Sequence, residues 1–366
     1  MANFRKRITL VFAVLTLMPA SSWTQSVSYL ELRNAGRAEY LAGHLASAET
    51  LFRDARDGAE RAAEDETLAT IDNDLGDVYF GEERLEDAEQ AYARSLRLFK
   101  SMGNREYEVA VALRNLGSAY SLHQRYREAL KVLDEAGKLP FWRTHGGDRK
   151  TQALAAELAN TKGIVFFREN SLGKARDLFE EALRIRRDAG FGGGVGDDGT
   201  LNNIAMIYYK QHRYAQAEVL FLRSIAITSR VLGSSHPDLT LTLASLGEVY
   251  TALGRYSEAI EQYQRSLSIL RNMSPRLDGR IARTLERVSW MYLKQGDKSG
   301  AESAFTEAIE SARHVTVAED PGLPDMFDRY ATLLSRLGKA DQARNVHAEA
   351  QRIRVAAALT VRVSGK

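Results

Sequence analysis

Small and bulky apolar side chains recur along the chain in a fixed order. An alanine is followed four residues later by a bulky residue, and three residues after that by another small one, as in Ala217, Phe221 and Ser224. Spacings of three and four place side chains on one face of an α-helix, so each triplet predicts an amphipathic helix. Eight triplets occur, and their first alanines stand at positions 48, 88, 129, 175, 217, 259, 301 and 343.

A second helix is predicted before each triplet, at a constant distance from it. A small residue stands twelve positions before the first alanine and is usually followed three positions later by an aromatic residue, as in Gly247 and Tyr250. Short turns such as 253–255 separate the two helices. We therefore predict helix pairs in which the small residues allow a close approach and tyrosine or phenylalanine rings fill the groove between the helices.

These motifs resemble those of the tetratricopeptide repeat family. The resemblance is carried by LGDVY at 75–79, LGSAY at 116–120 and LGEVY at 246–250, each followed by its alanine triplet. The 42-residue period of the last four steps, and LGSSHPD at 232–238, are similar to the kinesin-light-chain type of repeat. The resemblance covers about residues 29 to 365. It implies an all-α fold, a right-handed superhelical solenoid of eight helix-turn-helix repeats.

The first 22 residues have the pattern of a cleaved signal peptide. Arg5, Lys6 and Arg7 precede an uncharged apolar run from 8 to 18, and small residues at Ala20 and Ser22 fit signal-peptidase cleavage before Trp23. The run is shorter than the roughly 20 residues of a membrane-spanning helix. We therefore expect a lead-in at 23–28, one repeat array at 29–354 and a helix end and tail at 355–366. We also expect a periplasmic or secreted protein without stable membrane insertion.

The composition excludes several kinds of function. The chain has no cysteine, which excludes disulfides, thiolate metal sites and cysteine nucleophiles. Without the signal peptide it carries 47 basic and 48 acidic residues, whereas a dedicated nucleic-acid binder needs a basic excess. No metal-ligand spacing and no nucleophile motif occurs. The sequence therefore predicts a non-enzymatic protein with no cofactor, no metal and no nucleic-acid partner.

Two linkers leave more than one interpretation open. The glycine-rich stretch 190–199 lacks the Gly-Lys-Ser/Thr ending of a phosphate loop and holds only one copy of a calcium-roll unit, so a flexible hinge is favoured. Phe141 and Trp142 lie in a widened linker, where they would form either an interaction surface or a contact folded under the loop.

The first helices of the pairs supply the candidate binding residues. In the tetratricopeptide family this helix lines an inner groove, and its fifth, ninth and twelfth positions point into the groove. Asparagine amides there would hydrogen-bond the backbone of an extended peptide, and exposed aromatic rings would hold its side chains. The alternative is that the rings pack on the neighbouring repeat and the polar groups face water. The candidates are Asn73, Arg114, Asn160, Asn202, Phe80, Phe167, Tyr209 and Trp290.

The sequence thus predicts an exported scaffold that binds an extended segment of a protein or peptide partner in this groove. The alternative is an architectural subunit of a cell-envelope complex that uses its convex or lateral surfaces. A homo-oligomer is compatible with either function.

Overall fold

The computed structural model describes residues 28–364 apart from 146, 195, 274–277 and 318–319. The predicted signal peptide, and all but the last residue of the lead-in, lie outside the described residues. Within them the regular secondary structure is entirely helical. The helices are α2 (Tyr29–Leu41), α3 (Leu45–Arg61), α4 (Asp65–Gly81), α5 (Leu85–Ser101), α6 (Glu106–Leu122), α7 (Tyr126–Ala136), α8 (Phe141–His145), α9 (Arg149–Arg168), α10 (Leu172–Asp188), α11 (Asp197–Lys210), α12 (Tyr214–Val231), α13 (Leu239–Ala252), α14 (Tyr256–Arg271), α15 (Asp278–Lys294), α16 (Lys298–Ala312), α17 (Leu323–Arg336) and α18 (Ala340–Ser364).

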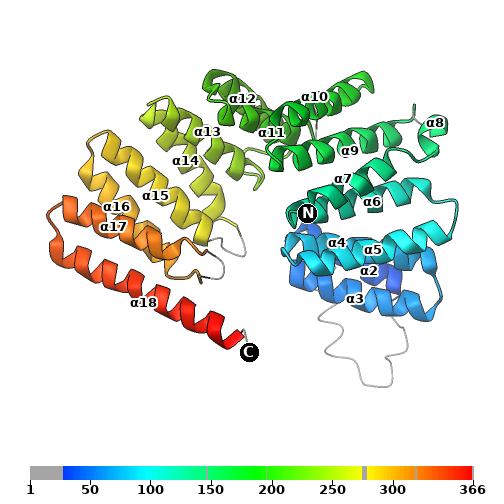
Figure 1. The fold of residues 1–366 in the computed structure, drawn as a ribbon, viewed down its shortest axis with the longest axis horizontal. Helices are drawn as coiled ribbons and strands as arrows, with labels where there is room; N and C mark the ends of the chain where they lie inside the picture. The colour runs from blue at the N-terminus through cyan, green and yellow to red at the C-terminus, as the bar shows by residue number, and fades with distance from the viewer. Residues whose placement is uncertain (1–27, 146, 195, 274–277, 318–319, 365–366) are drawn as a thin grey trace, which may run out of the picture. The chain divides into compact units, whose positions relative to one another are not determined.

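Consecutive helices pack as pairs, and within each of the two units described below the pairs stack on one another, which confirms the predicted helical solenoid (Figure 1). The chain divides into two compact units, one up to residue 146 and one from residue 147 onward. The first contains the pairs α2–α3, α4–α5 and α6–α7 and the short α8. The second contains the five pairs from α9–α10 to α17–α18. Their border falls in the linker where the repeat spacing widens to 46 residues.

Two layers of helices form each unit. The first helices of neighbouring pairs contact one another directly, α2 with α4 and α4 with α6, and likewise α9 with α11 and α11 with α13. We call the surface formed by these first helices the inner face of each unit. No helix in the described part of the chain combines the length and apolar character needed to cross a membrane.

Glycines in the first helices explain how closely the paired helices approach. A Cβ atom built on Gly76 would lie 2.4 Å from Cε1 of Tyr92, closer than van der Waals contact permits. Gly117, Gly163 and Gly247 stand against the bulky residue of their own pair in the same way, at 2.6 Å. The bulky residues are themselves buried. The predicted role of the small residues is confirmed.

A repeated arginine joins neighbouring pairs at the turns. Its guanidinium lies 4.3 to 4.4 Å from the centre of a tyrosine ring of the preceding helix, in the pairs Arg84–Tyr79, Arg125–Tyr120, Arg213–Tyr208 and Arg255–Tyr250. Three of these arginines also bind a glutamate of the pair before, in Arg84–Glu49, Arg125–Glu89 and Arg255–Glu218. Each such arginine therefore contacts both its own pair and the previous one.

The described residues of the glycine-rich loop form specific hydrogen bonds. Arg186, only 6% exposed, donates to the carbonyl of Gly196 at 2.9 Å and to Thr200 Oγ1 at 3.1 Å. Asp198 Oδ1 accepts from the Gly196 amide at 3.0 Å and its Oδ2 from Thr228 Oγ1 at 2.8 Å. A freely flexible hinge would not make these bonds, so that prediction is wrong for these residues. The loop instead fixes the start of α11.

The aromatic pair of the other widened linker folds inward. Phe141 is 7% exposed and meets Tyr107 of α6 edge-on, with ring centres 6.2 Å apart. Trp142 packs against Phe141 and donates its Nε1 hydrogen to the carbonyl of Ala136 at 2.8 Å. Of the two interpretations, folding under the loop is confirmed.

Candidate binding surfaces on the inner faces

The candidate residues divide between the two units. Asn73 and Phe80 lie on α4 and Arg114 on α6 of the first unit, while Asn160, Phe167, Asn202, Tyr209 and Trp290 lie on α9, α11 and α15 of the second. All eight side chains are half-buried. The four polar candidates, Asn73, Arg114, Asn160 and Asn202, thus form two pairs, one on the inner face of each unit.

In the first unit an amide that the sequence analysis missed joins two of the candidates. Asn115 Nδ2 donates to Asn73 Oδ1 at 3.0 Å, and Asn115 Oδ1 accepts from Arg114 Nη2 at 2.8 Å. Asn73 and Asn115 stand 42 residues apart, whereas the local repeat spacing of 41 pairs Asn73 with Arg114, so the repeat alone did not indicate this contact. The bond occupies one of the two acceptor lone pairs of the Asn73 oxygen, and the Nδ2 hydrogens of Asn73 have no partner in the described part of the unit.

A buried carboxyl group lies beside this amide pair. Asp77 Oδ1 accepts from Tyr92 Oη at 2.7 Å and from Asn115 Nδ2 at 3.4 Å. Burial raises the pKa of Asp77 to about 6, against the hydrogen bond from Tyr92, which lowers it, and Asp74 raises it further. A cavity of about 100 Å³ adjoins Asp77, lined by Arg37, Tyr40, Leu41, Phe52, Asp74 and Asp77.

In the second unit the asparagines are also engaged in the fold. Asn160 Oδ1 lies 3.2 Å from Thr200 Oγ1 of α11, but the single hydroxyl hydrogen of Thr200 has a closer acceptor in the carbonyl of Gly196, at 2.7 Å. Asn202 Oδ1 is buried and makes no hydrogen bond to the described residues. The buried oxygen of Asn202 is therefore closed to a ligand at the surface, whereas the oxygen of Asn160 keeps acceptor capacity. The Nδ2 hydrogens of both side chains have no partner among the residues described, and they are the groups available to a peptide carbonyl.

The aromatic candidates each rest partly on a hydrophobic core. Phe80, Phe167, Tyr209 and Trp290 all pack against buried apolar residues of their own unit. Trp290 meets Phe305 edge-on at 5.9 Å, and Lys210 Nζ lies 5.0 Å from the centre of the Phe167 ring. Packing against the core of the unit therefore accounts for the buried part of each ring, and for Trp290 the partner Phe305 belongs to its own helix pair.

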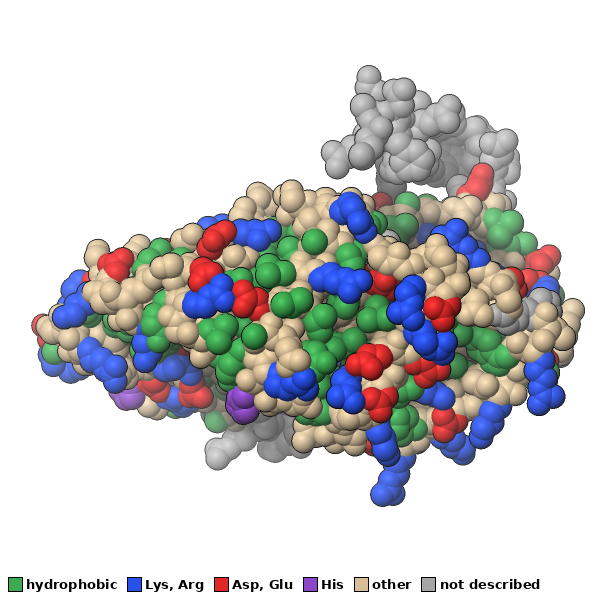
Figure 2. Space-filling model, turned by 90° about the horizontal axis from the view of Figure 1, so that it is seen from above, with side chains coloured by type: hydrophobic (Ala, Val, Ile, Leu, Met, Phe, Trp, Pro, Cys, Tyr) green, Lys and Arg blue, Asp and Glu red, His purple; other side chains and the backbone are tan. Residues whose placement is uncertain are grey.

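The charges on the molecular surface are mixed in sign. Figure 2 shows acidic and basic side chains interspersed with hydrophobic ones on the face in view. The described residues contain no group of three or more His, Asp and Glu side chains arranged to hold a metal ion. What the inner faces offer chemically is amide donors beside apolar ring surface.

Comparison with known proteins identifies the repeat. A tetratricopeptide repeat family profile matches residues 67–136 in the first unit and 198–272 in the second. The chain is a tetratricopeptide repeat protein. No curated protein matches it in sequence.

Solved structures agree with this tetratricopeptide fold. The crystal structure of BtubC (BKLC) from P. vanneervenii is 19% identical, with a TM-score of 0.56 over 63% of this chain and 91% of that one. The apo form of RapI is 16% identical, with a TM-score of 0.54 over 78% of this chain and 97% of that one. At these identities the likeness concerns the fold.

The buried carboxyl of this tetratricopeptide repeat protein predicts a pH dependence. Because the pKa of Asp77 is raised from 3.8 to about 6, the folded protein binds a proton more tightly than the unfolded chain. This contribution to stability is full below about pH 4 and is lost as the pH rises through 6, on the order of 3 kcal/mol in all. Asp77→Asn keeps the acceptor for Tyr92 and should remove the effect.

Urea unfolding at about pH 4.5 and at pH 7 measures this difference. The free energy of unfolding of Asp77→Asn should exceed that of the wild type at pH 7, and the two should converge at the lower pH. If the wild type and the variant change equally between the two pH values, Asp77 does not titrate in this window.

Proposed function

We propose that this protein is an exported, non-enzymatic scaffold that binds an extended segment of a partner protein along an inner face. The observation that carries the proposal is the placement of unpaired amide hydrogens on Asn73, Asn160 and Asn202 beside half-exposed aromatic rings. An extended peptide has a backbone carbonyl at every residue, and these accept hydrogen bonds whatever the sequence. The ring surfaces would add contacts to apolar side chains of the peptide.

The hydrogen bonds of the asparagine side chains specify the chemistry of the proposed partner more closely than the sequence did. An asparagine can both donate and accept, but the oxygen of Asn73 already accepts one hydrogen bond within the fold and that of Asn202 is buried, whereas the Nδ2 hydrogens of Asn73, Asn160 and Asn202 have no partner among the described residues. The inner faces therefore offer amide donors to a partner that supplies acceptors. A peptide backbone running along the first helices meets this requirement through its carbonyl groups.

The test uses a peptide selected against the wild-type protein from a displayed library. Replacing Asn73, Asn160 and Asn202 together by alanine should weaken binding by about tenfold or more, since each lost hydrogen bond contributes roughly 0.5–1.5 kcal/mol. Fluorescence anisotropy gives the affinity, and circular dichroism checks that the helices persist.

Asn345→Ala on the exposed side of α18 is the matched control and should leave the affinity unchanged. Equal affinity of the triple variant and the wild type would exclude the amide groove. Export is tested separately by sequencing the N-terminus of the protein from its native host. A start at Trp23, or at Ser21 after cleavage behind the small residue Ala20, supports export, and a start at Met1 contradicts it.

A further inference from the structure

One helix pair of the first unit breaks the apolar pattern of the array. Four positions before the small residue of the first helix, the other seven pairs have Leu32, Leu113, Ala159, Leu201, Leu243, Leu285 and Phe327, all apolar. The second pair has Asp72 there, with a side chain only 1% exposed. Arg56 of α3 is a second exception, because five of the other seven pairs have leucine or isoleucine at its position.

Arg56 and Asp72 form an ion pair with each other, and a second arginine, Arg94, binds the same carboxylate. Arg56 Nε donates to Asp72 Oδ1 at 3.0 Å, and Arg94 Nε of α5 donates to the same oxygen at 3.2 Å. Both guanidinium groups thus bind Asp72 through their Nε atoms. The terminal nitrogens of Arg94 make no hydrogen bond to any described residue, and those of Arg56 make only a long contact of 3.4 Å to the exposed Glu60.

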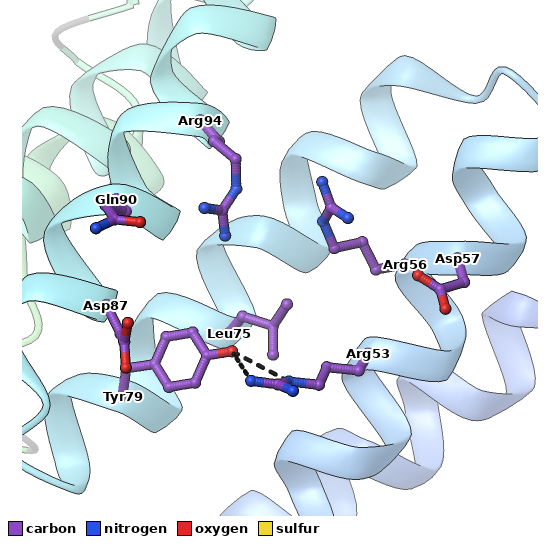
Figure 3. A pocket seen from close by; sticks show the side chains of 8 residues that line it. All are labelled: Arg53, Arg56, Asp57, Leu75, Tyr79, Asp87, Gln90 and Arg94. Carbon is purple, nitrogen blue, oxygen red and sulfur yellow. Dashed lines mark hydrogen bonds between the residues drawn. The ribbon is translucent and has the colours of Figure 1, made fainter.

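A cavity of about 460 Å³ opens in front of these two arginines (Figure 3). Arg94 and Arg56 stand on opposite sides of it, with Leu75 between them. A third arginine, Arg53, crosses the cavity and donates to Tyr79 Oη at 3.3 and 3.4 Å. The remaining lining residues are Asp57, Asp87 and Gln90. The pocket lies between α3, α4 and α5, so the second helices of two pairs contribute to it.

Stability alone does not explain this arrangement. Burying a carboxylate with its cations costs as much free energy as the ion pair returns, and apolar residues of similar size usually do as well or better. The other pairs of the same chain show that apolar residues fit this position. A local departure from the pattern of a fold is most often found where a site is built.

We propose that this pocket binds a compact oxyanion, a carboxylate or phosphate group, held between the terminal nitrogens of Arg56 and Arg94. Two guanidinium groups share the single charge of Asp72, which leaves the cluster of Arg56, Asp72 and Arg94 with one net positive charge. Planar guanidinium edges match the paired oxygens of a carboxylate or phosphate. Asp57 and Asp87 at the rim disfavour an extended polyanion, so the ligand is a single anionic group. The site is separate from the inner-face amides.

Calorimetric titration of the full-length protein with inorganic phosphate, and separately with acetate, tests this site. At least one anion should bind with a Kd in the millimolar range, and Arg94→Met should weaken it by about tenfold or more. Arg97→Met, an exposed arginine one turn further along α5 and outside the pocket, is the control and should have no effect. Tighter binding of phosphate indicates a phosphate ligand, and binding of acetate alone indicates a carboxylate. Absence of binding for both anions, or equal binding by Arg94→Met, overturns the proposal.

A double variant separates a binding role from a structural one. Replacing Asp72 and Arg56 together by leucine restores the residue types of the other pairs. The double variant should fold with a Tm equal to or higher than that of the wild type, and it should no longer bind the anion. A clear fall in Tm, measured by circular dichroism, would show that the ion cluster serves the fold, and it would contradict the proposal.

Discussion

Replacing Gly76 by valine is expected to lower the free energy of unfolding of the first unit by about 3 kcal/mol or more. The added Cβ would lie 2.4 Å from Cε1 and 2.5 Å from Cδ1 of Tyr92. Tyr92 cannot move aside easily, because its ring is 2% exposed and its hydroxyl is hydrogen-bonded to Asp77. The helices α4 and α5 must therefore separate. Denaturant unfolding followed by far-ultraviolet circular dichroism measures the loss.

Gly173→Ala is the matched control for this variant. Gly173 also lies in a helix, α10, but a Cβ built on it meets no atom within 4 Å. Because alanine is the better helix former, the control should be neutral or stabilising by up to about 1 kcal/mol. A loss of stability in Gly173→Ala as large as in Gly76→Val would mean that close helix contact is not the cause.

Replacing Phe305 by alanine is expected to lower the free energy of unfolding of the second unit by about 3–5 kcal/mol, as is typical when a large cavity is created in a core. Phe305 is completely buried, stacks on Tyr330 with ring centres 5.1 Å apart and supports Trp290 edge-on. The cavity would remove the support of a residue on the inner face. Urea unfolding gives the stability, and tryptophan fluorescence reports the changed surroundings of Trp290.

Val219→Ala serves as the control for the cavity variant. Val219 is 63% exposed on α12, so its truncation should change the stability by less than about 0.5 kcal/mol. If Phe305→Ala unfolds at the same urea concentration as the wild type, the second unit does not depend on this aromatic cluster.

The repeat period made the fold predictable. Gly76 faces Tyr92, and Gly247 faces Tyr263, because a fixed spacing in the sequence becomes a fixed contact between two paired helices. The glycine-rich loop was not predictable in the same way. Its order depends on Arg186, which lies outside the stretch that composition marks and whose reach to Gly196 no local pattern indicates.

The candidate site was predictable in position but not in chemistry. Their spacing from the first alanine of each repeat placed Asn73, Asn160 and Asn202 on the inner faces. It did not show that Asn115 occupies the oxygen of Asn73, because that bond depends on how neighbouring helices turn toward each other. Asp72 could have been found from the sequence, since it is a charged residue at a position that is otherwise apolar.

The side-chain bonds between neighbouring pairs have a consequence for how the chain acquires its structure. Even the bond from Arg329 to Glu286 spans only 43 residues, and those from Arg84, Arg125 and Arg255 to the preceding glutamates span 35 to 37. A newly made chain can therefore complete each pair as soon as the next one has emerged from the ribosome or a translocation channel. In the part of the chain that the structure describes, no such side-chain bond requires a partner far along the sequence, and proteins with such local contacts fold rapidly.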